Sequence, residues 1–235
     1  KGAWHHAVMI GLLFGLDFLF LYWSVSFTTA SRATIFLYSH PFWVALGAHF
    51  VVDQDRLHPG KAAGLVLAFA GLWMVFRIQS PALPENNWIG DMMSLAAAVF
   101  WAATTLYIKR ISQTVTLNHY QTLFSQLVFA IPVLLAGSLL FEHDYTIVPA
   151  AGVLWAMAYQ IVVVAFFSYT LWFWMIHNFA VSGLTAFTFL APLFGVVFGA
   201  VILSEPVGIR VWSGLALVCA GIYLVNRSPR KNPSR

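Results

Sequence analysis

The chain has 235 residues, of which 60% are hydrophobic and 9% are charged, against roughly 45–50% and about 25% in ordinary soluble domains. This composition excludes a water-soluble globule and predicts an all-α, polytopic membrane helix bundle in a lipid bilayer. The net charge of +4 comes from residues spread through the loops and a short basic tail, and the chain has one cysteine. We therefore predict no nucleic-acid partner, no internal disulfide and no thiolate metal cluster.

Apolar blocks close to the length that crosses hydrocarbon, about 20 residues of helix, recur along the chain. We predict eight spans, over residues 7–27, 33–52, 61–78, 89–111, 117–141, 152–176, 182–203 and 211–225.

The first span carries Asp17 near its midpoint. A charged, unpaired carboxyl at that depth costs at least a few kcal/mol, so it must be protonated, paired or hydrated. Two interpretations stay open: a proton or cation site, or a hydrogen bond to a neighbouring helix. Gly11 and Gly15, four residues apart, predict a packing face on the same span.

The second span contains Pro41, which removes the hydrogen bond to the carbonyl of Leu37 and predicts a kink or hinge. A carbonyl freed in this way must face protein or a water-filled cavity. Thr34, Tyr38 and His40 lie near it, and we expect them to line a substrate cavity. His40 is also a candidate for proton coupling, because imidazole can carry protons near neutral pH.

The third span begins with a second small-residue pair, Gly60 and Gly64, which predicts helix packing. After the linker 79–88, the fifth span offers Gln121 and Gln126 as hydrogen-bonding groups to a pocket.

The sixth span adds Gln160, Ser168, Tyr169 and Trp172 as pocket candidates. Trp172 lies near a span end, where tryptophan is usually an interfacial anchor. We therefore prefer the deeper Gln160 and Ser168 as cavity residues.

The seventh span repeats the pattern of the second, with Pro192 following Thr185 and Thr188. Because the proline recurs at the same place, we predict that both threonines and Pro192 line a cavity or form a hinge. Gly195 and Gly199 on this span predict close helix packing.

Residues 20–77 can be overlaid on residues 171–227, with Pro41 over Pro192 and Gly64 over Gly214. The matching spans lie five spans apart, and an odd displacement makes the second copy cross the membrane in the opposite sense. The sequence thus predicts an inverted repeat of five transmembrane helices, with eight of an expected ten spans present. We divide the chain into a first repeat lacking its first two helices (1–78), a linker (79–88), a second repeat of five helices (89–227) and a basic cytoplasmic tail (228–235).

Charge predicts the orientation. With the carboxy terminus in the cytoplasm, nine lysine and arginine residues lie inside and three outside, as the positive-inside rule requires.

The motifs of the second copy resemble those of a known family. It opens with Ile89-Gly90-Asp91 and a helix carrying Trp101-Ala102. It closes with Pro192, Ser204-Glu205-Pro206, Trp212-Ser213-Gly214 and Ala220-Gly221. In this order they resemble the drug/metabolite transporter (DMT) superfamily, in its EamA-type branch of two five-helix repeats. Ser204 stands where that family usually has glycine, and the first copy reads Asp53-Gln54-Asp55 at the matching turn.

The resemblance implies export or exchange of small metabolites by alternating access, often coupled to protons, in a bacterial inner membrane. From the side chains, the substrate could be an amino acid, a related metabolite or a drug. A non-transporting sensor or scaffold of the same fold is the alternative. An intramembrane enzyme is disfavoured because the chain has no H-E-x-x-H motif, and we expect no second buried aspartate to form a dyad with Asp17. We predict no catalytic residue, no cofactor and no metal, while the oligomeric state stays open.

Overall fold

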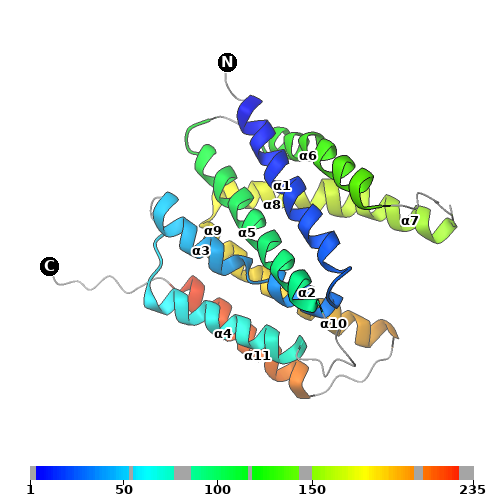
Figure 1. Cartoon of the computed structure of the whole chain (residues 1–235). Helices are drawn as coiled ribbons and strands as arrows, with labels where there is room; N and C mark the ends of the chain where they lie inside the picture. Colours follow the sequence, from blue (N-terminus) through cyan, green and yellow to red (C-terminus); the bar gives the residue numbers. More distant parts are fainter. Residues whose placement is uncertain are drawn as a thin grey trace.

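The computed structural model describes residues 4–52, 55–76, 86–115, 118–142, 150–203 and 209–227. These residues form a bundle of helices and contain no strand (Figure 1). The predicted all-α membrane bundle is thereby confirmed. Most of the predicted linker 79–88 and the whole tail 228–235 lie outside the described residues.

The helices follow one another along the chain as two sets separated by the linker. The first set is α1 (Trp4–Ser24), α2 (Ala30–Leu37), α3 (His40–Val51) and α4 (Pro59–Phe76). The second set is α5 (Asn87–Ile111), α6 (His119–Phe141), α7 (Ala151–Tyr159), η1 (Gln160–Ser168), α8 (Tyr169–Asn178), α9 (Val181–Ala186), η2 (Phe187–Phe189), α10 (Leu190–Leu203) and α11 (Ile209–Asn226).

Four stretches of the described chain are long and apolar enough to cross a membrane: α1, α5, α6 and the continuous helix Ala151–Asn178. The last stretch joins α7 to α8 through η1, nine residues of π-helix. No residue of α7 or η1 is buried, and Figure 1 shows α7 extending away from the rest of the bundle.

The predicted second and seventh spans are interrupted near their prolines. Between α2 and α3 the helix stops at Tyr38 and Ser39, and Pro41 stands in the first turn of α3. In the second copy the three residues of η2 form a 3-10 segment before α10, which contains Pro192. Both interruptions follow from a proline that cannot donate a backbone hydrogen bond.

Two hydrophobic cores meet along the interrupted helices. One core gathers Ile10, Val44, Phe173 and Leu184 with other residues of α1, α3, α5, α6, α8 and α9. The other joins residues of α4 and α11 to Phe189 of η2. Helices α3 and α9 contribute to both, and all six residues of α9 are buried. The interrupted helices of the two copies therefore lie at the centre of the fold.

The two copies meet most extensively where α4 packs along α11, at the lower edge of Figure 1. A Cβ atom built on Gly64 would lie 2.7 Å from the carbonyl oxygen of Gly221, and one on Gly71 would lie 2.7 Å from that of Gly214. Gly64 corresponds to Gly214 in the repeat and Gly71 to Gly221. Gly64 thus packs against the counterpart of Gly71, and Gly71 packs against the counterpart of Gly64. An inverted repeat produces this reciprocal arrangement.

We expect Gly64→Ala to lower the stability of the protein by about 1–3 kcal/mol, the usual cost of overpacking a close contact. The added methyl group would meet backbone of α11, which cannot turn away as a side chain can. Thermal unfolding in detergent measures the effect. Gly152→Ala is the matched control, because a Cβ there has no atom within 4 Å; equal melting temperatures for the two variants would contradict the packing argument.

Candidate functional site

A cavity of about 120 Å³ lies among α1, α5, α6 and α8, with one residue of α2 in its lining. Three helices line it in the same way, with residues at spacing i, i+3, i+4 and i+7, which places each set on one helix face. These sets are Phe14, Asp17, Phe18 and Leu21 of α1, Trp101, Thr104, Thr105 and Ile108 of α5, and Tyr169, Trp172, Phe173 and Ile176 of α8. Leu37 and Gln126 complete the lining.

Two polar groups in the lining lack partners. Asp17 is 4% exposed, and its Oδ1 atom has no hydrogen-bond partner among the described residues. Gln126 is 1% exposed, and its Nε2 atom also has none there. Buried polar groups are nearly always hydrogen-bonded. Two such groups in one cavity therefore indicate a site for a ligand, a proton or water.

Leu37, four residues before Pro41, lines the cavity directly. Tyr38 and His40 lie behind the cavity wall: the ring of His40 stacks on that of Trp101 at 3.7 Å between centroids, and the ring of Tyr38 meets Trp101 edge-on at 6.2 Å. His40 is fully buried, and neither ring nitrogen has a hydrogen-bond partner among the described residues. The break between α2 and α3 therefore supports Trp101.

The three threonines expected at the cavity bond to their own helices instead. Thr34 Oγ1 donates to the carbonyl of Ala30 at 2.8 Å, Thr185 Oγ1 to that of Val181 at 2.8 Å and Thr188 Oγ1 to that of Thr185 at 2.6 Å. They do not line the described cavity, nor do Pro41 and Pro192.

The preference for Gln160 and Ser168 over Trp172 needs correction. Both polar residues lie in η1, which is not covered by the bundle, and Ser168 Oγ donates to the carbonyl of Val164 at 2.7 Å. Trp172 lines the cavity one turn into α8, where the helix enters the core. The amino-terminal part of this span diverges from its neighbours, so depth along the chain did not indicate burial.

The small residues predicted for packing occupy several interfaces. A Cβ on Gly11 would lie 2.3 Å from Cβ of Phe129, and one on Gly15 would lie 2.8 Å from Cβ of Val133, so both face α6. Gly60, in the first turn of α4, has His58 as its nearest neighbour. The surroundings of Gly195 and Gly199 in α10 lie outside the described residues.

One polar cluster joins α5 to α2 and the turn before it. Thr28 Oγ1 donates to Asp91 Oδ1 at 2.9 Å, Arg32 Nε donates to the same oxygen at 3.2 Å, and Arg32 Nη2 contacts Asp91 Oδ2. Asp91 is 4% exposed. We call Thr28, Arg32 and Asp91 the Asp91 cluster.

A second cluster joins α9 to α4 and the connection before it. Lys61 Nζ donates to Asp55 Oδ1 at 2.7 Å and to Ser182 Oγ at 2.8 Å, and the amide of Ser182 donates to Asp55 Oδ2 at 3.0 Å. Burial would raise the pKa of Asp55, but hydrogen bonds from Lys61 and Ser182 outweigh it and hold the pKa below its ordinary value. We call Asp55, Lys61 and Ser182 the Asp55 cluster.

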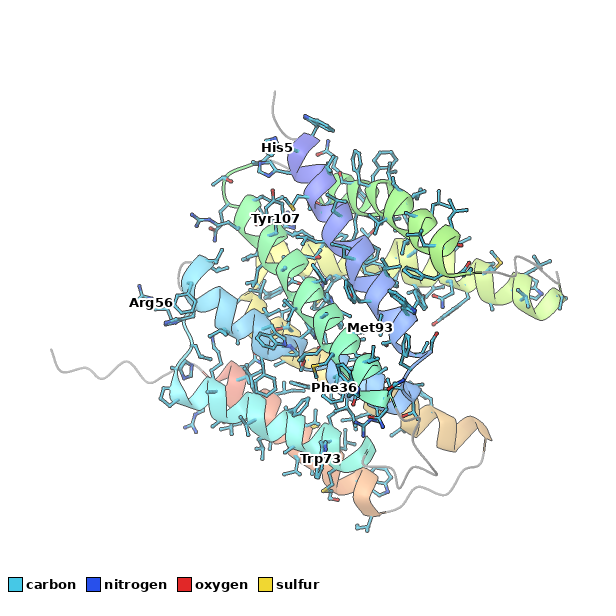
Figure 2. All side chains as sticks on the ribbon, in the orientation of Figure 1. His5, Phe36, Arg56, Trp73, Met93 and Tyr107 are labelled. Carbon is cyan, nitrogen blue, oxygen red and sulfur yellow. The ribbon has the colours of Figure 1, made fainter. Side chains whose placement is uncertain are left out.

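The two clusters lie toward opposite ends of the bundle. Met93, two residues past Asp91, and Tyr107 mark the two ends of α5 in Figure 2, and Arg56 lies on the side of Tyr107. Arg32 and Ser182 occupy neighbouring positions in the repeat, each near the start of an interrupted helix. Each interrupted helix is therefore held at one end by a polar cluster, α2 by the Asp91 cluster and α9 by the Asp55 cluster.

Sequence reasoning missed Trp101, Thr104 and Thr105 of α5. Their i, i+3, i+4 spacing matches that of Phe14, Asp17 and Phe18, and this shared pattern was the available signal. In the described part of the chain no cluster of histidine, cysteine or acidic residues could hold a metal ion.

Comparison with known proteins gives a match to the model of the EamA-like transporter family over residues 1–77 and 88–227. The chain is 23% identical to "Uncharacterized transporter YoaV" of Bacillus subtilis over 222 residues, which are 92% of this chain and 74% of that protein. It is 27% identical to a "Probable amino-acid metabolite efflux pump" of Salmonella typhimurium over 216 residues, 88% of this chain and 71% of that one. A crystal structure that is 22% identical superposes with a TM-score of 0.78 over 95% of this chain and 75% of the other.

Proposed function

The chain belongs to the EamA-like transporter family and is an integral-membrane transporter of small molecules rather than an enzyme; from this premise we propose that it works by alternating access coupled to protons. In alternating access a central site opens to one side of the membrane at a time. The chain must then have a central site, two closures and a flexible element between them.

The observation that carries this proposal is the pair of polar clusters at opposite ends of the bundle. Breaking the Asp91 cluster would free α2 from α5, and breaking the Asp55 cluster would free α9 from α4. Each cluster holds a carboxylate with a cation and a hydroxyl, so its groups can exchange partners for water when the end opens. Substrate would enter and leave through these two ends in turn.

The interrupted helices supply the flexible element. Backbone that lacks the regular hydrogen bonds of a helix can bend more easily than a continuous helix. We therefore assign the breaks near Pro41 and Pro192 as hinges about which the two copies, residues 1–78 and 89–227, move relative to each other.

Asp17 supplies the coupling site. A buried carboxyl without a cationic partner binds and releases a proton as the cavity faces one solution and then the other. Among the described residues lining the cavity, Asp17 and Tyr169 are the two that can ionise, and a tyrosine ordinarily stays neutral below about pH 10. His40, which contacts the cavity wall through Trp101, remains a second candidate.

Two further assignments follow from the distribution of positive residues and from the relatives of the chain. We place the carboxy terminus and the Asp55 end in the cytoplasm, because positive residues concentrate on that side. Export of amino-acid-related metabolites is supported by the name of the Salmonella relative.

Thiol labelling tests alternating access. In a Cys219→Ser background, Ala33→Cys reports on the Asp91 end and Leu184→Cys on the Asp55 end; both native side chains are at most 6% exposed. We expect a membrane-impermeant maleimide to label one cysteine at one direction of the pH gradient and the other when the gradient is reversed. Gly152→Cys, at an exposed position, is the control whose labelling should not change with the gradient.

Labelling that rises and falls in parallel at both ends would contradict alternating access. If labelling does not change with the pH gradient and no flux is seen in liposomes, the result would favour a sensor or scaffold function.

A further inference from the structure

The central cavity combines an aromatic wall with an acid that lacks a counter-ion. Six of its lining residues are aromatic: Phe14, Phe18, Trp101, Tyr169, Trp172 and Phe173. The other buried aspartates of the described chain are paired, Asp55 with Lys61 and Asp91 with Arg32. Asp17 differs from both, since no lysine, arginine or histidine among the described residues lines its cavity.

The lysine nearest in sequence to the lining is already engaged by other groups. Lys109 follows Ile108 of the wall, but its Nζ donates to the carbonyls of Ile176 and Phe179 at 2.8 and 2.9 Å and to that of His177 at 3.3 Å. It closes the end of α8 rather than reaching Asp17. Among the described residues none that lines the cavity supplies a positive charge, so a cation that pairs with Asp17 would come from a bound molecule.

Aromatic rings favour the same kind of molecule. The face of a tryptophan, tyrosine or phenylalanine ring attracts a cation, and the attraction is stronger where water is excluded. The cavity offers Trp101 and Trp172 from facing helices together with Asp17. The volume of about 120 Å³ is below the usual range of drug-sized pockets, about 300–1,000 Å³, so the site suits a compact body.

The same lining disfavours a zwitterion. The carboxylate of an α-amino acid would lie in an apolar cavity beside Asp17 without a cation of its own, and burying an unpaired charge is expensive. The free Nε2 of Gln126 can donate to a neutral acceptor, such as a hydroxyl or carbonyl oxygen. The cavity thus complements a molecule with one positive charge and no carboxylate.

We propose that the substrate is a small organic amine, a monocation with an aromatic or apolar body, whose ammonium group binds Asp17 between the rings of Trp101 and Trp172. This rests on the proposed transport function only in identifying the bound molecule as the substrate. The amine would be supplied by reactions that remove or mask the carboxylate of an amino acid.

A matched pair of ligands tests the proposal on the purified full chain. Phenethylamine and phenylalanine share the same ring and ammonium group and differ in the carboxylate. We expect phenethylamine to bind at least about tenfold more tightly, a difference of about 1.4 kcal/mol, in a radioligand assay. Asp17→Asn should abolish this preference, and Asp17→Glu, which keeps the charge, should retain part of it.

Two tryptophans on one helix give the control for the aromatic wall. Trp172→Leu should weaken binding of phenethylamine, whereas Trp174→Leu should not, because Trp174 is 45% exposed and outside the lining. This comparison and the ligand pair on the unaltered protein remain decisive even if an Asp17 variant fails to fold.

Equal or tighter binding of phenylalanine would overturn the proposal, as would an equal effect of the two tryptophan substitutions. Flux of phenylalanine in liposomes without binding of phenethylamine would overturn the amine proposal and leave transport standing. Selective binding of phenethylamine without flux would support the amine site and contradict the transport function.

Discussion

Replacing Asp17 by asparagine is expected to reduce pH-gradient-driven flux to the background of empty liposomes and to remove its pH dependence. Asparagine has nearly the same shape but cannot take up or release a proton, so the cavity would lose its coupling site. The measurement is flux of a transported compound with and without an imposed pH gradient.

A stability measurement separates this result from misfolding. Because the unpaired carboxyl is costly within a span, Asp17→Asn should melt at the same temperature as the unaltered protein or higher. Asp17→Glu keeps an ionisable group and should retain coupled flux. If the pH dependence of flux is unchanged in Asp17→Asn, another group carries out the coupling. His40→Gln would then be the next variant to measure.

The second large effect is expected from Lys61→Met. Removing the cation leaves the carboxylate of Asp55 buried without its ion-pair partner, and breaking a buried pair costs about 3–5 kcal/mol. We expect a loss of about 3 kcal/mol, the lower end of that range, because the Asp55 cluster lies near an end of the bundle where water can enter. Thermal unfolding in detergent measures it.

Two variants control this prediction. Arg56→Met removes the same charge from an exposed neighbour and should have little effect. The double variant Asp55→Asn/Lys61→Met removes both charges and should recover much of the loss. A melting temperature for Lys61→Met equal to that of Arg56→Met would show that the cluster does not hold α9 to α4.

The acid dependence of stability follows from the same carboxylate. The pKa of Asp55 is lower in the folded protein than its ordinary value, which is about 3.9. Its contribution to stability is therefore complete above about pH 4 and is lost as the pH falls through the lowered pKa.

Several features of the fold could be predicted because they depend on local chemistry. Composition alone identified membrane helices, and the prolines at 41 and 192 located the interruptions, since a missing backbone donor acts wherever the helix packs. The corresponding glycines at 64 and 214 revealed the inverted repeat. Asp17 was identified as unusual because a carboxyl within a span is costly in any tertiary arrangement.

The wall of the cavity could not be predicted in the same way. The buried face of a helix in a soluble protein can be recognised because one side is apolar and the other polar, whereas α1, α5 and α8 carry apolar side chains on all sides. Thr34, Thr185 and Thr188 were plausible cavity residues, yet each hydroxyl bonds to its own helix. Trp172, assigned to the membrane interface, lines the cavity instead.

By itself the sequence determined that the chain lies in a membrane, that its helices form a repeat of inverted topology, and that Asp17, Pro41 and Pro192 lie within predominantly apolar spans. Only the tertiary structure decided which faces of α1, α5 and α8 meet, and so which rings surround Asp17, and it paired Asp55 with Lys61 and Asp91 with Arg32. The reason is physical. Crossing the bilayer depends on each segment's own composition, but the rotation of one apolar helix against another is set by close packing and a few polar contacts between distant residues.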